Sequence, residues 1–194
     1  MEEIKKSILA SIFISIGSFV LFKVGTPLGA FLFALGLYAV CMLKANLFTG
    51  KCGFIFEDKK WGRLIIILIV NILSGFIIGK ILSYADPTLT SLALEKVIAM
   101  NVSWSFFIKS VMCGAIMFIA VKTFKEGSVW GILIGIPTFI LCGFQHSIAN
   151  AITMGIADRY DFGALGICIL GNFLGSLLIW YLAKSNLLFK TTKI

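Results

Sequence analysis

The stretch Gly143-Phe144-Gln145-His146-Ser147-Ile148-Ala149-Asn150 decides the fold, because it places polar groups inside an apolar segment of the chain. His146 is the only histidine in 194 residues. A polar, titratable cluster at membrane depth is energetically costly and is usually functional. A similar stretch, Asn46-Leu47-Phe48-Thr49-Gly50, interrupts an earlier apolar segment. Two broken apolar segments in corresponding halves of a chain predict a permeation site near the bilayer midplane.

The composition is that of an integral membrane protein. The chain is 59% hydrophobic and 13% charged, and its mean hydropathy is +1.03. No stretch outside the apolar segments is long enough to build a soluble core, so we expect one transmembrane channel domain over residues 1–194. The five cysteines have no metal-ligand spacing, and neither a phosphate-binding loop nor a Ser/His/Asp arrangement is present. We therefore predict no metal, no cofactor and no enzymatic activity.

Six apolar stretches of roughly 20 residues are long enough to cross the hydrocarbon core as helices. They cover about Ser7–Val24, Leu28–Asn46, Leu64–Ser83, Trp104–Thr123, Val129–Met154 and Gly163–Lys184.

Basic residues sort to one side of this predicted topology. With the N-terminus in the cytoplasm, the outer ends carry three cations and the cytoplasmic ends carry eleven. The outer cations are Lys23, Lys96 and Arg159, and the cytoplasmic ones are Lys5, Lys6, Lys51, Lys59, Lys60, Arg63, Lys122, Lys125, Lys184, Lys190 and Lys193. This bias predicts a multi-pass protein of the cell (inner) membrane with both termini in the cytoplasm. It also explains most of the net charge of +8, so no nucleic-acid partner is expected.

A weak internal repeat completes the predicted architecture. Asn71-Ile72-Leu73-Ser74-Gly75 in the third span resembles Asn172-Phe173-Leu174-Gly175-Ser176 in the sixth. Each half holds three spans, an odd number, so the second half enters the membrane in the opposite orientation. We expect an all-α, aquaporin-like membrane fold of two inverted three-helix repeats, at about residues 7–83 and 104–184. The second and fifth helices are broken, at Leu47–Gly50 and Gln145–Asn150.

These motifs resemble those of the formate/nitrite transporter family, over about Ser7 to Lys184. The family's first broken helix reads approximately G-x-E-L-F-T-G-N, and in this chain it is Lys44-Ala45-Asn46-Leu47-Phe48-Thr49-Gly50-Lys51. Its second reads approximately G-F-E-H-S-x-A-N, matched by Gly143 to Asn150, and its last span contains G-N-x-x-G-G, matched by Gly171 to Ser176. This chain departs from the pattern where Asn46 and Gln145 replace two carboxylates. It departs again at Gly114, which replaces a pore-facing asparagine of the fourth span.

The resemblance implies an aquaporin-like fold, assembly as a homopentamer, and one pore per protomer with a proton-linked histidine between two apolar constrictions. The residues it implies for the central site are His146 and Thr49. The implied constrictions are Phe33, Leu37 and Phe139 on the outer side, and Leu47, Phe48 and Met117 on the inner side. The expected polar supports of the broken helices are Asn46, Asn71, Gln145, Ser147, Asn150 and Asn172. The expected anion-attracting cations at the outer mouth are Lys96 and Lys109.

Elementary electrostatics favours weak acids in such a pore. A bare monovalent anion in an apolar neck costs about 20 kcal/mol in the Born limit, and its neutral conjugate acid costs far less. Histidine titrates near ambient pH and is the natural proton-linked group, while Thr49 can donate a hydrogen bond without adding charge. Lys44 could either extend to the cytoplasm or face the inner vestibule.

We therefore predict a channel or transporter for formate, nitrite or hydrosulfide, or for their conjugate acids, working passively or with proton linkage. Two alternatives stay open. One is an aquaporin-like channel for a neutral solute such as water, ammonia or a small polyol, although the Asn-Pro-Ala motifs of aquaporins are absent. The other is a non-conducting membrane scaffold.

Overall fold

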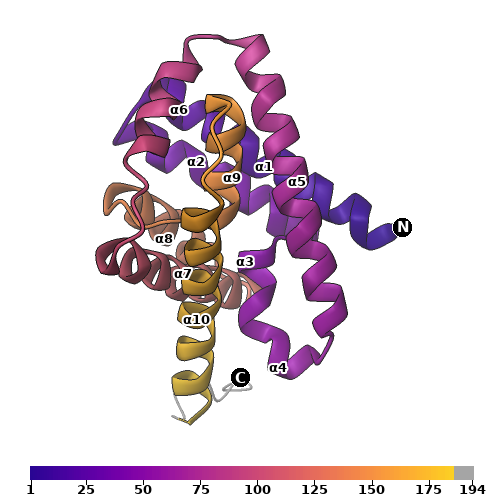
Figure 1. The fold of residues 1–194 in the computed structure, drawn as a ribbon. Helices are drawn as coiled ribbons and strands as arrows, with labels where there is room; N and C mark the ends of the chain where they lie inside the picture. The colour runs from indigo at the N-terminus through magenta and orange to yellow at the C-terminus, as the bar shows by residue number, and fades with distance from the viewer. Residues whose placement is uncertain (186–194) are drawn as a thin grey trace.

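The computed structural model describes residues 1–185, and every regular element in that range is helical (Figure 1). Lys190 and Lys193, two of the cations predicted on the cytoplasmic side, lie outside the described residues. The elements are α1 (Glu2–Val24), α2 (Leu28–Met42), α3 (Phe48–Lys51), the 3-10 helix η1 (Cys52–Phe54), α4 (Ile55–Asp58), α5 (Trp61–Ala85), α6 (Leu89–Ile98), α7 (Trp104–Lys125), α8 (Trp130–Leu141), α9 (Ser147–Ala157) and α10 (Phe162–Ser185).

Among residues 1–185, four helices are long and apolar enough to cross a membrane, namely α1, α5, α7 and α10. These helices also have exposed apolar faces, whose contact with water would be energetically unfavourable. On α5, Ile65, Ile69, Leu73 and Ile77 are exposed and follow one another at four-residue intervals along a single face. Such a continuous apolar face is explained by contact with lipid or with another membrane helix.

The predicted second span, Leu28–Asn46, extends past the observed end of its first helix and leaves out the helical segment that follows the break. The helix α2 stops at Met42, and the helical path that follows the break, α3–η1–α4, continues to Asp58. The prediction that the chain is interrupted at Leu47–Gly50 is therefore wrong by several residues, because residues 43–47 form the break and Phe48 is already helical. Hydropathy misses the second half because it is short and contains Gly50, Lys51 and Gly53.

The fifth span is also broken, between α8 and α9 at residues 142–146. Only Gln145 and His146 of the predicted interruption Gln145–Asn150 lie in this break, since Ser147 begins α9. Each helix before a break ends in the same way, with a left-handed residue: Lys44 at φ 51° and Gly143 at φ 67°. The following amide then donates back five residues, from Ala45 to the carbonyl of Val40 and from Phe144 to that of Phe139. This is the hydrogen bond of a Schellman motif, which terminates a helix sharply.

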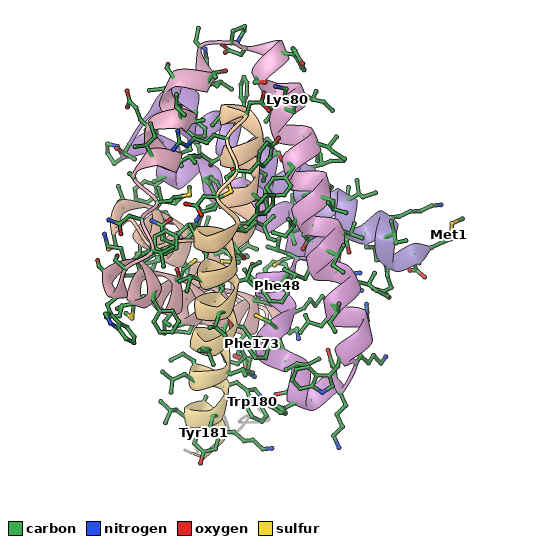
Figure 2. The ribbon with its side chains drawn as sticks, viewed as in Figure 1. Met1, Phe48, Lys80, Phe173, Trp180 and Tyr181 are labelled. Atoms are coloured by element: carbon green, nitrogen blue, oxygen red, sulfur yellow. The ribbon has the colours of Figure 1, made fainter. Side chains whose placement is uncertain are left out.

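The short helices that follow the two breaks, α3 and α9, lie inside the bundle (Figure 1). The helix α9 packs against α5 and α6, while α3 and η1 pack against α7 and α10. Each of these two short helices thus contacts a long helix from the other half of the chain: α9 contacts α5, and α3 contacts α7. Figure 2 shows Phe48, the first residue of α3, in the middle of the molecule. The helix α6 lies in the link between α5 and α7, where hydropathy predicted no element.

Candidate functional site

A buried asparagine supports the first break. Asn71 of α5 is fully buried, and its Oδ1 accepts a hydrogen bond from the Phe48 amide at 2.8 Å. Its Nδ2 donates to the carbonyls of Asn46, at 3.1 Å, and Ser7, at 2.9 Å. The Asn46 amide donates to the carbonyl of Lys6. One side chain therefore satisfies backbone groups that the break would otherwise leave unpaired in an apolar interior.

The second break repeats this arrangement with different residues. Asn172 of α10 is fully buried, and its Oδ1 accepts from the Ser147 amide at 2.8 Å. Its Nδ2 donates to the carbonyls of Gln145, at 2.7 Å, and Ser110, at 2.8 Å. The Gln145 amide donates to the carbonyl of Lys109, as Asn46 does to Lys6. The internal repeat seen in the sequence thus extends to individual hydrogen bonds.

The two breaks bring His146 and Thr49 into contact. His146 Nε2 lies 2.8 Å from Thr49 Oγ1, and both residues are buried. His146 precedes α9, and its Nδ1 accepts a hydrogen bond from the Ala149 amide at 3.1 Å. An acceptor nitrogen carries no proton, so the neutral ring is protonated on Nε2 and donates to Thr49. The hydroxyl hydrogen of Thr49 is then free to donate to a third group.

Aromatic side chains surround the imidazole on one side. The rings of Phe139 and His146 are stacked with centroids 5.9 Å apart, and Phe33 meets Phe139 edge-on at 6.1 Å. All three line a cavity of about 410 Å³ that also contains Lys96, Gln145 and Ser18 in its wall, and which we call the Lys96 cavity.

A second cavity of about 310 Å³ is lined by residues of the first break and of the helices beside it. We call it the three-lysine cavity, after Lys44, Lys51 and Lys125 in its wall, and it is also lined by Leu37 and Leu47. Lys44 thus faces this cavity, which was one of the two alternatives open from the sequence.

The two cavities approach each other within one helical turn. Phe33 lines the first and Leu37 the second, and four residues of α2 span about 6 Å. Phe48 and Met117 are buried and are absent from both linings. Of the residues expected at the constrictions, Phe33 and Phe139 thus line the Lys96 cavity, and Leu37 and Leu47 line the three-lysine cavity.

The two cations expected at one mouth are placed differently. Lys96 lines the Lys96 cavity, and its Nζ lies 4.5 Å from the centroid of the Phe22 ring. Although the residue as a whole is exposed, desolvation of its ammonium lowers the pKa of Lys96 below that of an ordinary lysine. Lys109 is exposed on α7 and does not line the Lys96 cavity. Its contact with the site is through its backbone carbonyl, which accepts a hydrogen bond from the Gln145 amide.

The side chains of the two breaks differ more than their backbones. Gln145 Oε1 accepts from Asn150 Nδ2 at 3.1 Å, so the second break carries a neutral amide pair. Asn46 Nδ2 instead donates to Glu3 Oε2 at 2.7 Å, and Arg63 Nε donates to the same oxygen at 2.7 Å. The sequence offered no sign that Glu3 contacts the first break, because Glu3 and Asn46 are far apart in the chain. Ser147 Oγ is buried without a protein partner among the described residues.

The asparagine-to-glycine departure in the fourth span is explained by helix packing. A Cβ at Gly114 would lie 2.1 Å from the carbonyl oxygen of Asn172. The α-carbon of Gly114 therefore faces α10 at a close approach of the two backbones, where a larger residue does not fit.

This arrangement matches a known family of membrane proteins. The family model described as formate/nitrite transporter matches residues 2–161, which is most of the chain. The chain belongs to the formate/nitrite transporter family. No curated protein matches it.

Solved structures show the same fold. One, described as an FNT family ion channel, has a TM-score of 0.75 and 18% sequence identity, over 91% of this chain and 84% of that one. Another, described as a pentameric formate channel with formate bound, has a TM-score of 0.68 and 18% identity, over 95% of this chain and 94% of that one. The chain is therefore an all-helical membrane protein with the fold of these channels.

Proposed function

We propose that this protein is a membrane channel for small monovalent anions, with formate, nitrite and hydrosulfide as the substrate class, or for their conjugate acids. The observation that carries the proposal is the His146–Thr49 hydrogen bond within a buried apolar layer, with a lysine-bearing cavity on either side. No aspartate or glutamate within residues 1–185 lines either cavity. Cationic cavities without carboxylates concentrate anions and disfavour cations.

The central pair suits a weak acid in transit. In the neutral tautomer His146 donates to Thr49, and Thr49 donates its own hydroxyl hydrogen to an oxygen or sulfur of the substrate. The apolar layer opposes a bare charge, so passage is favoured when the anion takes up a proton beside the imidazole. Phe33, Leu37 and Phe139 form one constriction in this proposal, and Leu47, Phe48 and Met117 form the other.

The proposed topology follows from the repeated breaks. The two halves form inverted three-helix repeats that cross the membrane six times, and α2–α3 and α8–α9 are the two broken crossings. Both termini are cytoplasmic in this topology, so the three-lysine cavity opens inward and the Lys96 cavity outward. The pentameric formate channel with the same fold supports assembly as a homopentamer.

Proteoliposomes containing a pH-sensitive dye test the proposal. Addition of sodium formate, nitrite or hydrosulfide outside should acidify the lumen if the acid, or the anion with a proton, passes through the protein. The matched variant is His146→Asn, because asparagine also caps helices and keeps an acceptor for the Ala149 amide. We expect a changed rate or a changed pH dependence in this variant. Passage of water or glycerol with none of the three anions would reject the proposal, and an unaltered His146→Asn rate at every pH would remove histidine from it.

A further inference from the structure

The three-lysine cavity carries more positive charge than a monovalent substrate requires. Its three cations come from separate elements: Lys44 from the first break, Lys51 from α3 and Lys125 from α7. Within residues 1–185, none of the three forms an ion pair with a carboxylate. Lys125 Nζ lies instead 3.3 Å from the centroid of the Phe54 ring. Lys51 and Lys125 are close enough to repel each other, and Lys44 is exposed in the same cavity wall, so a bound anion would relieve this repulsion.

Nearby carboxylates do not occupy the cavity. Glu57 and Asp58 on α4 are exposed and are absent from its lining. Glu57 Oε1 accepts a hydrogen bond from Trp180 Nε1 at 2.7 Å, which directs it to another surface. These carboxylates attract the lysines from a distance without neutralising them at the cavity wall.

The backbone at Lys44 supports a ligand role for its side chain. Lys44 has φ 51°, and the matching residue of the second break is Gly143, at φ 67°. A left-handed residue other than glycine costs roughly 1–2 kcal/mol, so glycine is the favoured choice at both positions. Strained residues of this kind are concentrated at functional sites. In this chain the strained position places an ammonium in the wall of a cavity.

We propose that the three-lysine cavity binds a multivalent oxyanion of the phosphate or phosphomonoester class and that the bound anion blocks the pore from this side. The blocking part rests on the proposed channel function. Several oxygens of one such anion can accept from the three ammonium groups at once. The anion cannot proceed, because Leu37 and Leu47 close the cavity toward His146 and burial of several charges costs more than burial of one.

A binding experiment on the full chain in neutral detergent tests the site without reference to transport. The probe is inorganic pyrophosphate, measured by titration calorimetry on the wild type, on Lys44→Gly and on a matched control, Lys59→Gly. Lys59 is also a left-handed lysine, at φ 54°, but it is exposed and absent from the cavity wall. Both substitutions remove one charge and relieve the same strain, so misfolding is not expected in either. We expect Lys44→Gly to weaken pyrophosphate binding by about tenfold or more, and Lys59→Gly to stay within about twofold of the wild type.

A flux experiment separates soluble anions from lipid headgroups, which share this chemistry. Formate-driven acidification is measured in phosphatidylcholine vesicles with and without pyrophosphate on the side of the three lysines, and in vesicles that also contain phosphatidic acid. Inhibition by either source, relieved in Lys44→Gly and retained in Lys59→Gly, supports the proposal and identifies the source. Equal binding and equal inhibition in all three proteins would overturn it. If pyrophosphate binding depends on Lys44 but the protein conducts no anion, the proposed channel function alone is rejected. If the protein conducts anions but neither pyrophosphate nor phosphatidic acid inhibits the flux, this inference alone is rejected.

Discussion

Replacement of Asn172 by leucine should destabilise the fold strongly, although the two side chains have the same number of heavy atoms and branch at the same carbon. The substitution removes three hydrogen bonds: one from the Ser147 amide, at 2.8 Å, and two to the carbonyls of Ser110, at 2.8 Å, and Gln145, at 2.7 Å. Asn172 is fully buried, so water cannot replace these partners. The Ser110 carbonyl keeps its hydrogen bond within α7, so the Ser147 amide and the Gln145 carbonyl are the groups that lose their partner at the break. At roughly 1–3 kcal/mol for each of these two groups, the expected loss of unfolding free energy is about 2–6 kcal/mol.

The loss can be measured by reversible unfolding in mixed micelles with sodium dodecyl sulfate as the denaturant, followed by far-UV circular dichroism. Asn101→Leu is the control, because Asn101 is exposed and its side chain makes no hydrogen bond within residues 1–185. A local readout is the hydrogen exchange of the Ser147 amide, which should accelerate in Asn172→Leu. A loss below about 1 kcal/mol, or an equal loss in the control, would refute the idea that Asn172 holds the second break together.

Three further outcomes are expected. Thr49→Val should lower the initial rate of formate-driven acidification by about 10- to 150-fold, as loss of a hydrogen bond worth about 1.5–3 kcal/mol predicts, whereas Thr49→Ser should retain most of it. Gly114→Ala should lower the unfolding free energy by about 1–3 kcal/mol, whereas Gly166→Ala, with open space around its α-carbon, should raise it slightly. Lys96→Gln should lower anion uptake by about two- to tenfold at low ionic strength, and the ratio of wild-type to variant rates should fall toward one as pH rises. Because its pKa is lowered, Lys96 loses its charge at a lower pH than an ordinary lysine, so this fall should begin below the usual lysine range.

The features that sequence reasoning identified are those encoded by local patterns. The long apolar helices follow from hydropathy, and Gly143 marks a helix end that glycine favours. The pairing of His146 with Thr49 could be anticipated because both stretches interrupt apolar segments and because the family resemblance implies both residues at the central site. Asn71 and Asn172 were expected to support the broken helices, and each makes hydrogen bonds to backbone groups at one of the breaks.

The features that sequence reasoning missed depend on contacts between distant residues. The first break begins earlier than predicted because Lys44 takes a conformation that its residue type disfavours. The helix α6 has only 10 residues, too few to form an apolar stretch of transmembrane length, so hydropathy gave no indication of a helix between α5 and α7. Lys51 and Lys125 line one cavity because α3 packs against α7, a contact that no local pattern encodes.

The charge balance of the pathway follows from where the carboxylates lie. The sequence suggests that both breaks have lost their acidic residue, yet α1 returns a carboxylate to the first break through Glu3. The Oε2 of that carboxylate accepts from Arg63 as well as from Asn46, and Glu3 attracts Lys51 from a distance without forming an ion pair with it. The second break carries only the neutral pair of Gln145 and Asn150. The second break is therefore neutral and the first adds the cation Lys44, so the attraction for anions arises from the lysines of the two cavities rather than from the amides that hold the helices open.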